Sequence, residues 1–278
     1  MAQGYEARLL RVLDYVYANL DGDLSLDTLA DVAALSRFHF HRVFTGMTGE
    51  TVAAFTRRVR LFRASIALVQ TNDPVDQIST YCGYSNARSF VRAFGDAYGL
   101  TPEAFRRQGV PHPALHLNEH GDYEMYDVNI ETRADTKLAV VAHRGDYMNV
   151  GEAFETAFTT LTARGFGPQI GQMIGLYWDD PAAVPLDDLR SFAGAEILGD
   201  AEIAAPLEQM DIKGGAFAVL KYQGHYSGLA KAYAYLFGEW VPKSGKDLRD
   251  SPPFEVYLNT PQDTAAEDLI TLICAPLK

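Results

Sequence analysis

The fold is decided by LDTLADVAALSRFHFHRVF (Leu26–Phe44), which recurs about fifty residues later as VDQISTYCGYSNARSFVRAF (Val75–Phe94). Each stretch has the spacing of two short helices joined by a tight turn. The offset is 49 before the turn and 50 after it, and the matched pairs include Leu29/Ile78, Phe40/Phe90, Arg42/Arg92 and Phe44/Phe94. The sequence therefore predicts a helix-turn-helix that occurs twice, and two such motifs in one chain can read successive faces of the major groove without a partner subunit.

Helical spacing and capping residues extend this prediction to an all-α region. Ser25, Ser36 and either Ser85 or Asn86 stand where a side chain commonly caps the first turn of a helix. Gly83 is expected to make the second turn. The expected helices cover residues 5–20, 26–33, 37–46 and 51–71, a segment beginning near Pro74, and residues 86–98 and 102–107.

The net charge of −12 is unevenly distributed. Residues 1–110 carry 12 arginines, no lysine and 11 acidic residues, whereas residues 111–278 carry 12 basic and 25 acidic residues. The first part is compatible with the phosphate backbone of DNA, and it contains a cluster formed by Arg57, Arg58, Arg60 and Arg63. The acidic second part suits a cationic ligand or another protein better.

Composition also indicates where the protein acts. The sequence contains no apolar run of about 18 residues, so no membrane span or membrane partner is expected. Charges inside the first apolar stretch argue against a signal peptide. Cys82 and Cys274 lie in different halves, which makes a disulfide improbable and favours a reducing cytoplasm.

A segment without periodicity separates the two halves. It begins at Gly109, contains Pro111 and Pro113, and includes His112, His116 and His120. Irregular histidine spacing without a cysteine favours a linker over a metal site. We therefore expect a DNA-binding domain over residues 1–108, a linker over 109–124 and a second domain over 125–278, with no metal or cofactor.

The second half repeats internally at an offset of 79 to 80 residues. The matched pairs include Ala139/Ala218, Gly145/Gly224, Tyr147/Tyr226, Phe158/Phe237, Tyr177/Tyr257 and Asp188/Asp268. Each copy reads as a strand, a G-x-Y turn, an amphipathic helix and two more strands. The sequence predicts a tandem α+β repeat arranged about a pseudo-two-fold axis, with a ligand cavity between the copies.

The second helix of each helix-turn-helix carries side chains suited to reading bases. The outward positions are expected to be Arg37, Phe38, His41 and Arg42 in the first, and Asn86, Ala87, Arg88, Val91 and Arg92 in the second. Arginine is the usual bidentate reader of guanine in the major groove, and Val91 could contact a thymine methyl. His39 and His41 are two residues apart on a helix and are not expected to ligate one metal ion.

The first half resembles the AraC/XylS family of regulators. The resemblance rests on LSRFHFHRVFTGMTGETVAAF, on RLFRASIAL and on GYSNARSFVRAFGDAYGLTPEAFR, which closes with a G-x-T-P-x-x-[YF]-R pattern. It implies double-stranded DNA as a partner and base contacts by Arg37, Phe38, His41, Arg42, Asn86, Ala87, Arg88 and Arg92. One departure is Ala34, where the family often has Gly and where a left-handed turn would strain alanine.

The second half resembles the GyrI-like effector-binding domain. The resemblance rests on the turns Arg144–Tyr147 and Gln223–Tyr226, on PPFEVYLNTP (Pro252–Pro261) and on LITLICAPL. The same domain order occurs in Rob-type regulators. Glu255 has Gly175 as its repeat partner and is expected to lie among aromatic side chains as a trap for an organic cation. The expected ligand-binding residues are Tyr147, Tyr177, Trp178, Tyr226, Trp240, Glu255 and Tyr257.

These observations favour a sequence-specific transcription regulator whose C-terminal domain binds a small amphipathic or cationic effector or contacts RNA polymerase. Two alternatives remain open at this stage. The C-terminal domain could be a GyrI-like hydrolase in which Glu255 acts with Tyr147 or Tyr226, although only His225 offers a second base. It could also be a protein-interaction module, which a salt bridge between Glu255 and a Lys or Arg would favour. The non-enzymatic interpretation is preferred.

Overall fold

The computed structural model describes residues 4–109, 125–199 and 201–278, so the predicted linker lies almost entirely outside the described residues. The chain forms two compact units. The first, called the helical unit, comprises Met1–Ala34 and Thr48–Gly121. The second, called the sheet unit, comprises Leu35–Met47 and Asp122–Lys278. The first predicted reading helix therefore belongs to the same compact unit as the C-terminal half.

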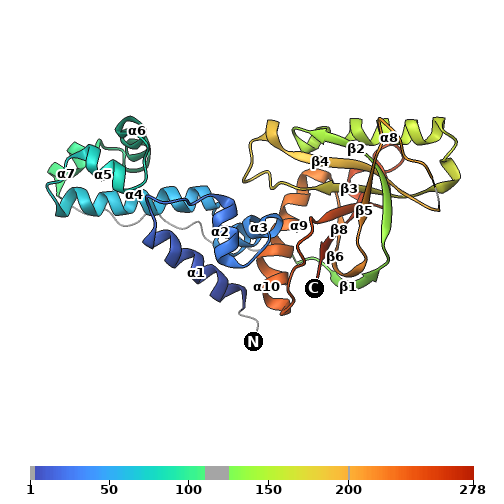
Figure 1. Ribbon diagram of the computed structural model, residues 1–278, viewed down its shortest axis with the longest axis horizontal. Coiled ribbons are helices and arrows are strands. Elements are labelled where there is room, and N and C mark those ends of the chain that lie inside the picture. The colour runs from blue at the N-terminus through green and yellow to red at the C-terminus, as the bar shows by residue number, and fades with distance from the viewer. Residues whose placement is uncertain (1–3, 110–124, 200) are drawn as a thin grey trace. The chain divides into compact units, whose positions relative to one another are not determined.

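The helical unit follows the predicted order of helices (Figure 1). Its helices are α1 (Tyr5–Ala18), α2 (Leu26–Ala33), α4 (Val52–Gln70), α5 (Val75–Tyr81), α6 (Ala87–Tyr98) and α7 (Pro102–Gln108). The helix α3 (Arg37–Thr48) follows α2 in the chain and lies in the sheet unit up to Met47. The double helix-turn-helix order, α2–α3 and α5–α6, is thereby confirmed.

Two of the three predicted helix caps are present, and caps at Thr51 and Thr101 are found in addition. Ser25, Thr51, Asn86 and Thr101 each accept a hydrogen bond from the backbone amide three residues later, which satisfies a donor at a helix start. The prediction for Ser36 is wrong, because its hydroxyl is buried without a hydrogen-bond partner among the described residues. Pro74 stands just before α5 instead of inside it.

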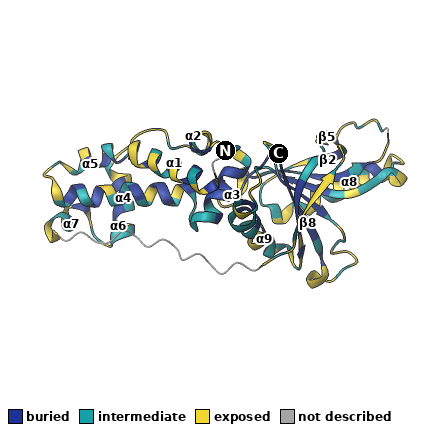
Figure 2. Cartoon of the chain, turned by 90° about the horizontal axis from the view of Figure 1, so that it is seen from below, coloured by how far each residue is buried: buried dark blue, intermediate teal, exposed yellow. Residues whose placement is uncertain are grey.

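Aromatic side chains form the core around the second helix-turn-helix. Phe90 and Phe94 on α6 and Phe105 on α7 are fully buried, and they pack with Leu68 of α4 and Ile78 of α5. Figure 2 shows buried positions along α4, the helix onto which the others pack. The 3.6-residue period of α6 places these apolar residues on one side and leaves its arginines on the other.

The two turns differ in how they tolerate a left-handed residue. Ala34 has φ +52° and Gly83 has φ +78°. Ala34 is the only residue other than glycine with positive φ in the described part of the chain. Arg8 donates to the carbonyl of Ala34, and Arg11 donates to the two carbonyls before it. These cations satisfy the carbonyl end of α2, which helps to hold the strained turn.

The sheet unit contains one eight-stranded antiparallel sheet. Its strands are β1 (Val128–Arg133), β2 (Thr136–Arg144), β3 (Ile170–Tyr177), β4 (Arg190–Ile197), β5 (Glu208–Ile212), β6 (Gly215–Gln223), β7 (Phe254–Tyr257) and β8 (Ile270–Pro276). The order across the sheet is β1-β6-β8-β7-β3-β4-β2-β5. The predicted tandem α+β repeat is confirmed, since each copy contributes four of the eight strands.

The strands β1 and β5 were not predicted. Each begins one repeat copy, but β1 pairs with β6 of the second copy and β5 pairs with β2 of the first. The copies therefore exchange their first strands across the sheet. At its centre, β3 and β7 pair so that Gly175 lies directly opposite Glu255. These two residues are repeat partners, so the pseudo-two-fold axis passes through this pair.

The two faces of the sheet bury different sets of side chains. One face is lined by apolar residues that include Leu176, Phe217, Phe254 and Val256. The other face is covered in part by α8 (Gly151–Ala163), whose Ala157 and Leu161 pack on β2 and β4. Because side chains alternate along a strand, Tyr177, Glu255 and Tyr257 lie on the helix-covered face.

A second helical segment belongs to the later copy. It runs through α9 (Leu229–Tyr235), the π-helical turn η5 (Leu236–Trp240) and α10 (Val241–Ser244). A Cβ added to Gly46 of α3 would lie 2.4 Å from the Cα of Gly238 in η5. The backbones of α3 and η5 are thus in direct contact, which only glycine at both positions allows.

None of the helices in the described residues combines the length and the apolar character needed to cross a bilayer.

Candidate functional site

The face of α6 that is opposite the core carries the polar residues predicted to read DNA. Asn86 caps the helix by accepting the amide of Ser89 at 2.8 Å. Arg88 and Arg92 are exposed and one turn apart, and Ala87 and Val91 are partly exposed beside them. A helix that presents two arginines on one side and is anchored by aromatic residues on the other suits the major groove.

The corresponding residues of α3 are placed differently. The expectation that His41 and Arg42 face outward is wrong in this structure, because they are only 3% and 8% exposed. Phe38 is partly buried with its ring 6.2 Å from Trp178, whereas Arg37 is exposed. The predicted outward placement assumed a helix that is covered on one side only. In the structure, the loop after β3 and the helical segment from α9 to η5 cover the side that carries Arg42.

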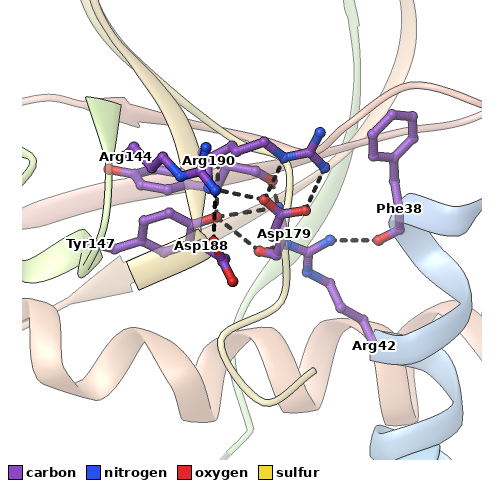
Figure 3. Close-up of polar contacts among 8 residues, drawn as sticks. Phe38, Arg42, Arg144, Tyr147, Asp179, Asp188 and Arg190 are labelled. Atoms are coloured by element: carbon purple, nitrogen blue, oxygen red, sulfur yellow. Dashed lines mark hydrogen bonds and ion pairs between the residues drawn. The ribbon is translucent and has the colours of Figure 1, made fainter. Parts of the chain in front are cut away.

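Polar contacts hold α3 against the loop that follows β3. Arg42 donates to the backbone carbonyls of Tyr177 and Asp179, at 3.3 and 3.0 Å (Figure 3). The Nδ1 of His41 lies 2.8 Å from a carboxylate oxygen of Asp180. Burial alone would raise the pKa of Asp180, but the hydrogen bond with His41 and the charge of Arg42 lower it. This loop is therefore a negatively charged support for α3.

The same loop is fixed from within the sheet unit. Arg190 forms a two-point pair with the carboxylate of Asp179, at 2.7 and 2.9 Å. The hydroxyl of Tyr147 donates to the carbonyls of Asp179 and Arg190, as Figure 3 shows. Burial raises the pKa of Tyr147 to about 12, so its hydroxyl stays a donor. The predicted ligand residue Tyr147 thus positions the loop.

Glu255 lies at the centre of a cluster of tyrosines. Its carboxylate accepts hydrogen bonds from Tyr233 at 3.0 Å and from Tyr257 at 2.6 Å. The hydroxyl of Tyr257 is also 2.6 Å from that of Tyr177, and the ring of Tyr226 lies 5.6 Å from the ring of Tyr257. We call these five residues the Glu255 cluster.

The carboxyl of Glu255 is 4% exposed. Burial raises its pKa to about 7, although hydrogen bonds from Tyr257 and Tyr233 and the charge of Arg42 act in the opposite direction. Burial likewise raises the pKa of the surrounding tyrosines, so they remain neutral donors. Near pH 7 this carboxyl is therefore partly protonated and partly ionised. An incoming cation can favour the ionised form, and the surrounding aromatic rings can contact the same cation.

Gly175 explains why the second copy alone carries this carboxyl. A Cβ at Gly175 would lie 2.8 Å from the ring of Tyr177, so the ring occupies the space of a side chain there. A second glutamate would also place two carboxyl groups opposite each other on the pseudo-two-fold axis, where like charges repel. Symmetry is therefore broken at the pair through which the pseudo-two-fold axis passes.

Besides Tyr147, two more of the predicted ligand residues lie outside the Glu255 cluster. Trp178 points to the opposite face of the sheet, where its ring lies 5.4 Å from Phe192 and under Arg190. Strand alternation next to Tyr177 requires this placement. Trp240 ends the π-helical turn η5 and is partly exposed, and no described contact joins it to Glu255.

Tyr233 was missed by the sequence prediction although the repeat contained the signal. Its repeat partner at an offset of 79 is Phe154, whose ring lies 5.2 Å from that of Tyr257. The pair Phe158/Phe237 in the same two helices was recognised, so extending the match back along them by one turn would have placed Tyr233 facing the sheet. The approach of Arg42 has no comparable signal in the sequence.

The structure gives little support to the two alternative functions. His225 is exposed and bonded to Ser227 in its own turn, so it is not paired with Glu255 as a catalytic base. Among the described ion pairs, none joins Glu255 to a lysine or arginine, which was the feature expected of a protein-interaction module.

Comparisons with known proteins agree with this architecture. Residues 126–278 match the GyrI-like family, described as a GyrI-like small molecule binding domain. Residues 29–108 match a helix-turn-helix domain family. The first match covers more than half of the chain, and it coincides with the sheet and its helices.

Relatives are similar over nearly the full length. The right origin-binding protein of Escherichia coli (strain K12) is 25% identical over 285 residues, covering 97% of this chain and 96% of the relative. The transcriptional regulator Rob of Salmonella typhimurium (strain LT2) has the same identity and coverage. The bifunctional transcriptional activator/DNA repair enzyme AdaA of Bacillus subtilis (strain 168) is 33% identical over 96 residues, which are 34% of this chain and 46% of the relative.

The two full-length relatives are a DNA-binding protein and a transcriptional regulator by name, and neither is named as an enzyme. The chain thus combines an AraC-type helix-turn-helix domain with a C-terminal small molecule binding domain, as expected of a DNA-binding regulator.

Proposed function

This chain belongs to the GyrI-like small molecule binding domain family, and on that premise we propose that it is a transcription regulator controlled by an amphipathic organic cation. The observation that carries the effector class is the buried carboxyl of Glu255 inside a cluster of neutral tyrosines. An anionic effector would be repelled there, and a neutral one would supply no positive charge for the ionised form of the carboxyl.

We propose that Asn86, Ala87, Arg88 and Arg92 of α6 read one half-site of an asymmetric DNA site. The exposure of Arg88 and Arg92 supports this role. We propose the same role at the other half-site for Arg37, Phe38, His41 and Arg42 of α3, in a state in which α3 is not held against the sheet unit. The two half-sites would lie about one helical turn apart.

Selection of DNA from a randomised library by the full chain tests the first part of the proposal. We expect Arg92→Ala to weaken binding to the selected site by about 1–3 kcal/mol and to relax the choice of bases at one half-site. Arg107→Ala is the matched control, because Arg107 is also exposed but lies on α7. Arg107→Ala should only reduce the dependence of DNA binding on salt concentration. Equal losses for both variants on specific and random DNA would contradict base reading by Arg92.

Binding of a matched pair of small molecules tests the effector class. Benzylguanidinium and neutral benzylurea have nearly the same shape, and we expect the full chain to bind the cation more tightly in calorimetric titrations. Glu255→Gln should remove most of that preference. Glu267→Gln is the control, because Glu267 is an exposed acid of the same unit. If the preference survives Glu255→Gln, Glu255 does not belong to the effector site.

We further propose that the regulator acts in the cytoplasm and communicates with RNA polymerase. The free, buried state of Cys82 and Cys274 is consistent with a reducing compartment. Transcription in vitro from a promoter that carries the selected site, with and without benzylguanidinium, tests the link to polymerase. If the amount of transcript does not change wherever the selected site is placed in the promoter, the proposed link to RNA polymerase is contradicted.

A further inference from the structure

The guanidinium of Arg42 occupies a position in the sheet unit that is built for a cation. Its Nη2 donates to the carbonyl oxygens of Tyr177 and Asp179. Its central carbon lies 5.6 Å from the ring centre of Tyr233 and 5.9 Å from that of Phe237. Two carbonyl oxygens and two aromatic faces thus surround one positive charge, which is the arrangement that binds organic cations.

This position is continuous with the Glu255 cluster. Tyr233 presents its ring to Arg42 and its hydroxyl to Glu255. The charge of Arg42 also stabilises the ionised forms of Glu255 and Asp180. Arg42 is therefore the positive partner of the acidic groups on this part of the sheet unit, in a place from which water is largely excluded.

Arg42 is held there because α3 is docked on the C-terminal part of the sheet unit. The imidazole of His39 stacks on Phe237 with ring centres 5.6 Å apart. Its Nε2 lies 3.0 Å from the carbonyl oxygen of Arg249. Further along the helix, Gly46 is in backbone contact with Gly238. Burial and the charge of Arg42 lower the pKa of His39 to about 3, so it docks as a neutral ring.

The docked face of α3 includes side chains that the proposed function assigns to base reading. Arg42 cannot hold the carbonyls of Tyr177 and Asp179 and also contact a guanine. While α3 is docked, the chain can therefore make its full set of base contacts only through α6, whose arginines are exposed. Docking of α3 and reading by α3 exclude each other.

We propose that Arg42 is an internal ligand of the effector site, and that an organic cation with a guanidinium-like head and an aromatic body displaces it and releases α3. This inference rests on the proposed function. The effector would then act by replacing one cation with another, and its binding would favour the state in which both reading helices are available. By linkage, DNA that engages α3 raises the affinity for the cation by the same factor.

Cation binding without DNA tests the competition directly. We expect Gly238→Ala to raise the affinity for benzylguanidinium, because a Cβ there would lie 2.6 Å from the backbone of Gly46 and would push α3 away while Arg42 stays in the chain. Coupling factors of about 5 to 150 are usual for such exchanges. Gly151→Ala is the matched control, because a Cβ at Gly151 of α8 meets nothing within 4 Å. Affinity unchanged by Gly238→Ala would overturn the proposal.

Arg42→Ala separates displacement from simple charge repulsion. It should raise the affinity for benzylguanidinium and change that for benzylurea little. If Arg42→Ala raises the affinity and Gly238→Ala does not, then the effect is one of charge at a distance and the proposal is overturned.

Tryptophan fluorescence provides a measurement that needs no undocking variant. Trp240→Phe leaves Trp178 as the only tryptophan, and Phe38 of α3 lies against its ring. We expect saturation with benzylguanidinium to shift the emission of Trp178 to longer wavelength as α3 leaves, and benzylurea to have no effect. An unchanged spectrum at saturation would overturn displacement of α3.

DNA binding completes the test and separates it from the proposed function. On the selected site, benzylguanidinium should raise the affinity of the full chain, and Gly238→Ala should bind tightly without it. A chain that selects no DNA would refute the proposed function, whereas the competition above is measured without DNA. Selective DNA binding that does not respond to bound cation would leave the proposed function standing and overturn this inference.

Discussion

Glu255 is a residue at which the two copies of the sheet unit differ in charge. It lies on the pseudo-two-fold axis opposite Gly175, which yields its space to the ring of Tyr177. The carboxyl is held by Tyr233 and Tyr257 and is almost fully buried. The duplicated fold thus carries a buried carboxyl on one side of its axis only, and this asymmetry suits recognition of one cation.

The raised pKa of Glu255 predicts a pH-dependent stability. The pKa is about 7 in the folded chain and near the ordinary 4.5 when unfolded, so the folded state binds a proton more tightly between these values. Stability should therefore fall as the pH rises from 4.5 through 7, by at most about 3 kcal/mol. The groups facing Glu255 are Arg42 and the tyrosines at 177, 226, 233 and 257.

Urea unfolding of the full chain at several pH values checks this prediction. Glu255→Gln removes the titrating group, so the difference in stability between the original chain and the variant should change with pH across that window. Parallel pH profiles for the two proteins would show that the carboxyl is not proton-linked to folding.

At the scale of elements, each of the two helix-turn-helix turns contains a residue with positive φ, but the two turns leave different amounts of room for a side chain. Ala34 is strained, but Arg8 and Arg11 donate hydrogen bonds to the backbone carbonyls at this end of α2. At Gly83 a Cβ would lie 2.1 Å from the carbonyl oxygen of Leu20 and 2.6 Å from the Nε of Arg60. The first turn therefore accepts alanine at a modest cost, whereas the second has no room for any side chain.

Substitutions at the two turns should have opposite effects on stability. Ala34→Gly relieves left-handed strain and should stabilise the chain by about 0.5–1 kcal/mol, after allowance for the flexibility of glycine. Gly83→Ala should destabilise it by about 2 kcal/mol or more, because strain and a backbone clash add. Denaturant midpoints of both variants measure this. Similar small losses at both sites would contradict the assigned difference.

At the scale of the whole molecule, the chain has two compact units with separate cores. Phe94 is buried in the helical unit with Phe90 and Phe105, and Phe217 is buried in the sheet unit beside Phe254. The helix α3 is continuous in sequence with the helical unit but belongs by its contacts to the sheet unit. One element is thereby shared between the part that reads DNA and the part that binds a small molecule.

Separate cores predict two unfolding transitions in calorimetry of the full chain. Phe94→Ala should lower the temperature of one transition and Phe217→Ala that of the other, since removal of a buried aromatic side chain costs about 3–5 kcal/mol. Each variant serves as the control for the other. A shift of both transitions by either substitution would show that the units unfold as one.

Much of the architecture could be predicted from the sequence because it follows from local rules. Periodicity and caps such as Ser25 and Asn86 determined most of the helices, and internal repeats determined both duplications. The repeat also identified Tyr147, Tyr177, Tyr226, Tyr257 and Glu255, which the structure brings near one another. The strands β1 and β5 escaped prediction because they pair across the two copies.

Only the tertiary structure decided which side of each reading helix is free. The repeat equates Arg42 with Arg92, and both follow the same helical period, so the sequence assigns them the same outward role. In the folded chain Arg92 is exposed, whereas Arg42 is buried against carbonyls and aromatic rings from residues more than 130 positions away. The spacing of apolar residues indicates which face a helix buries against elements that are close to it in the sequence. A second covered face depends on long-range packing, here the contact of Gly46 with Gly238, and no local pattern encodes it.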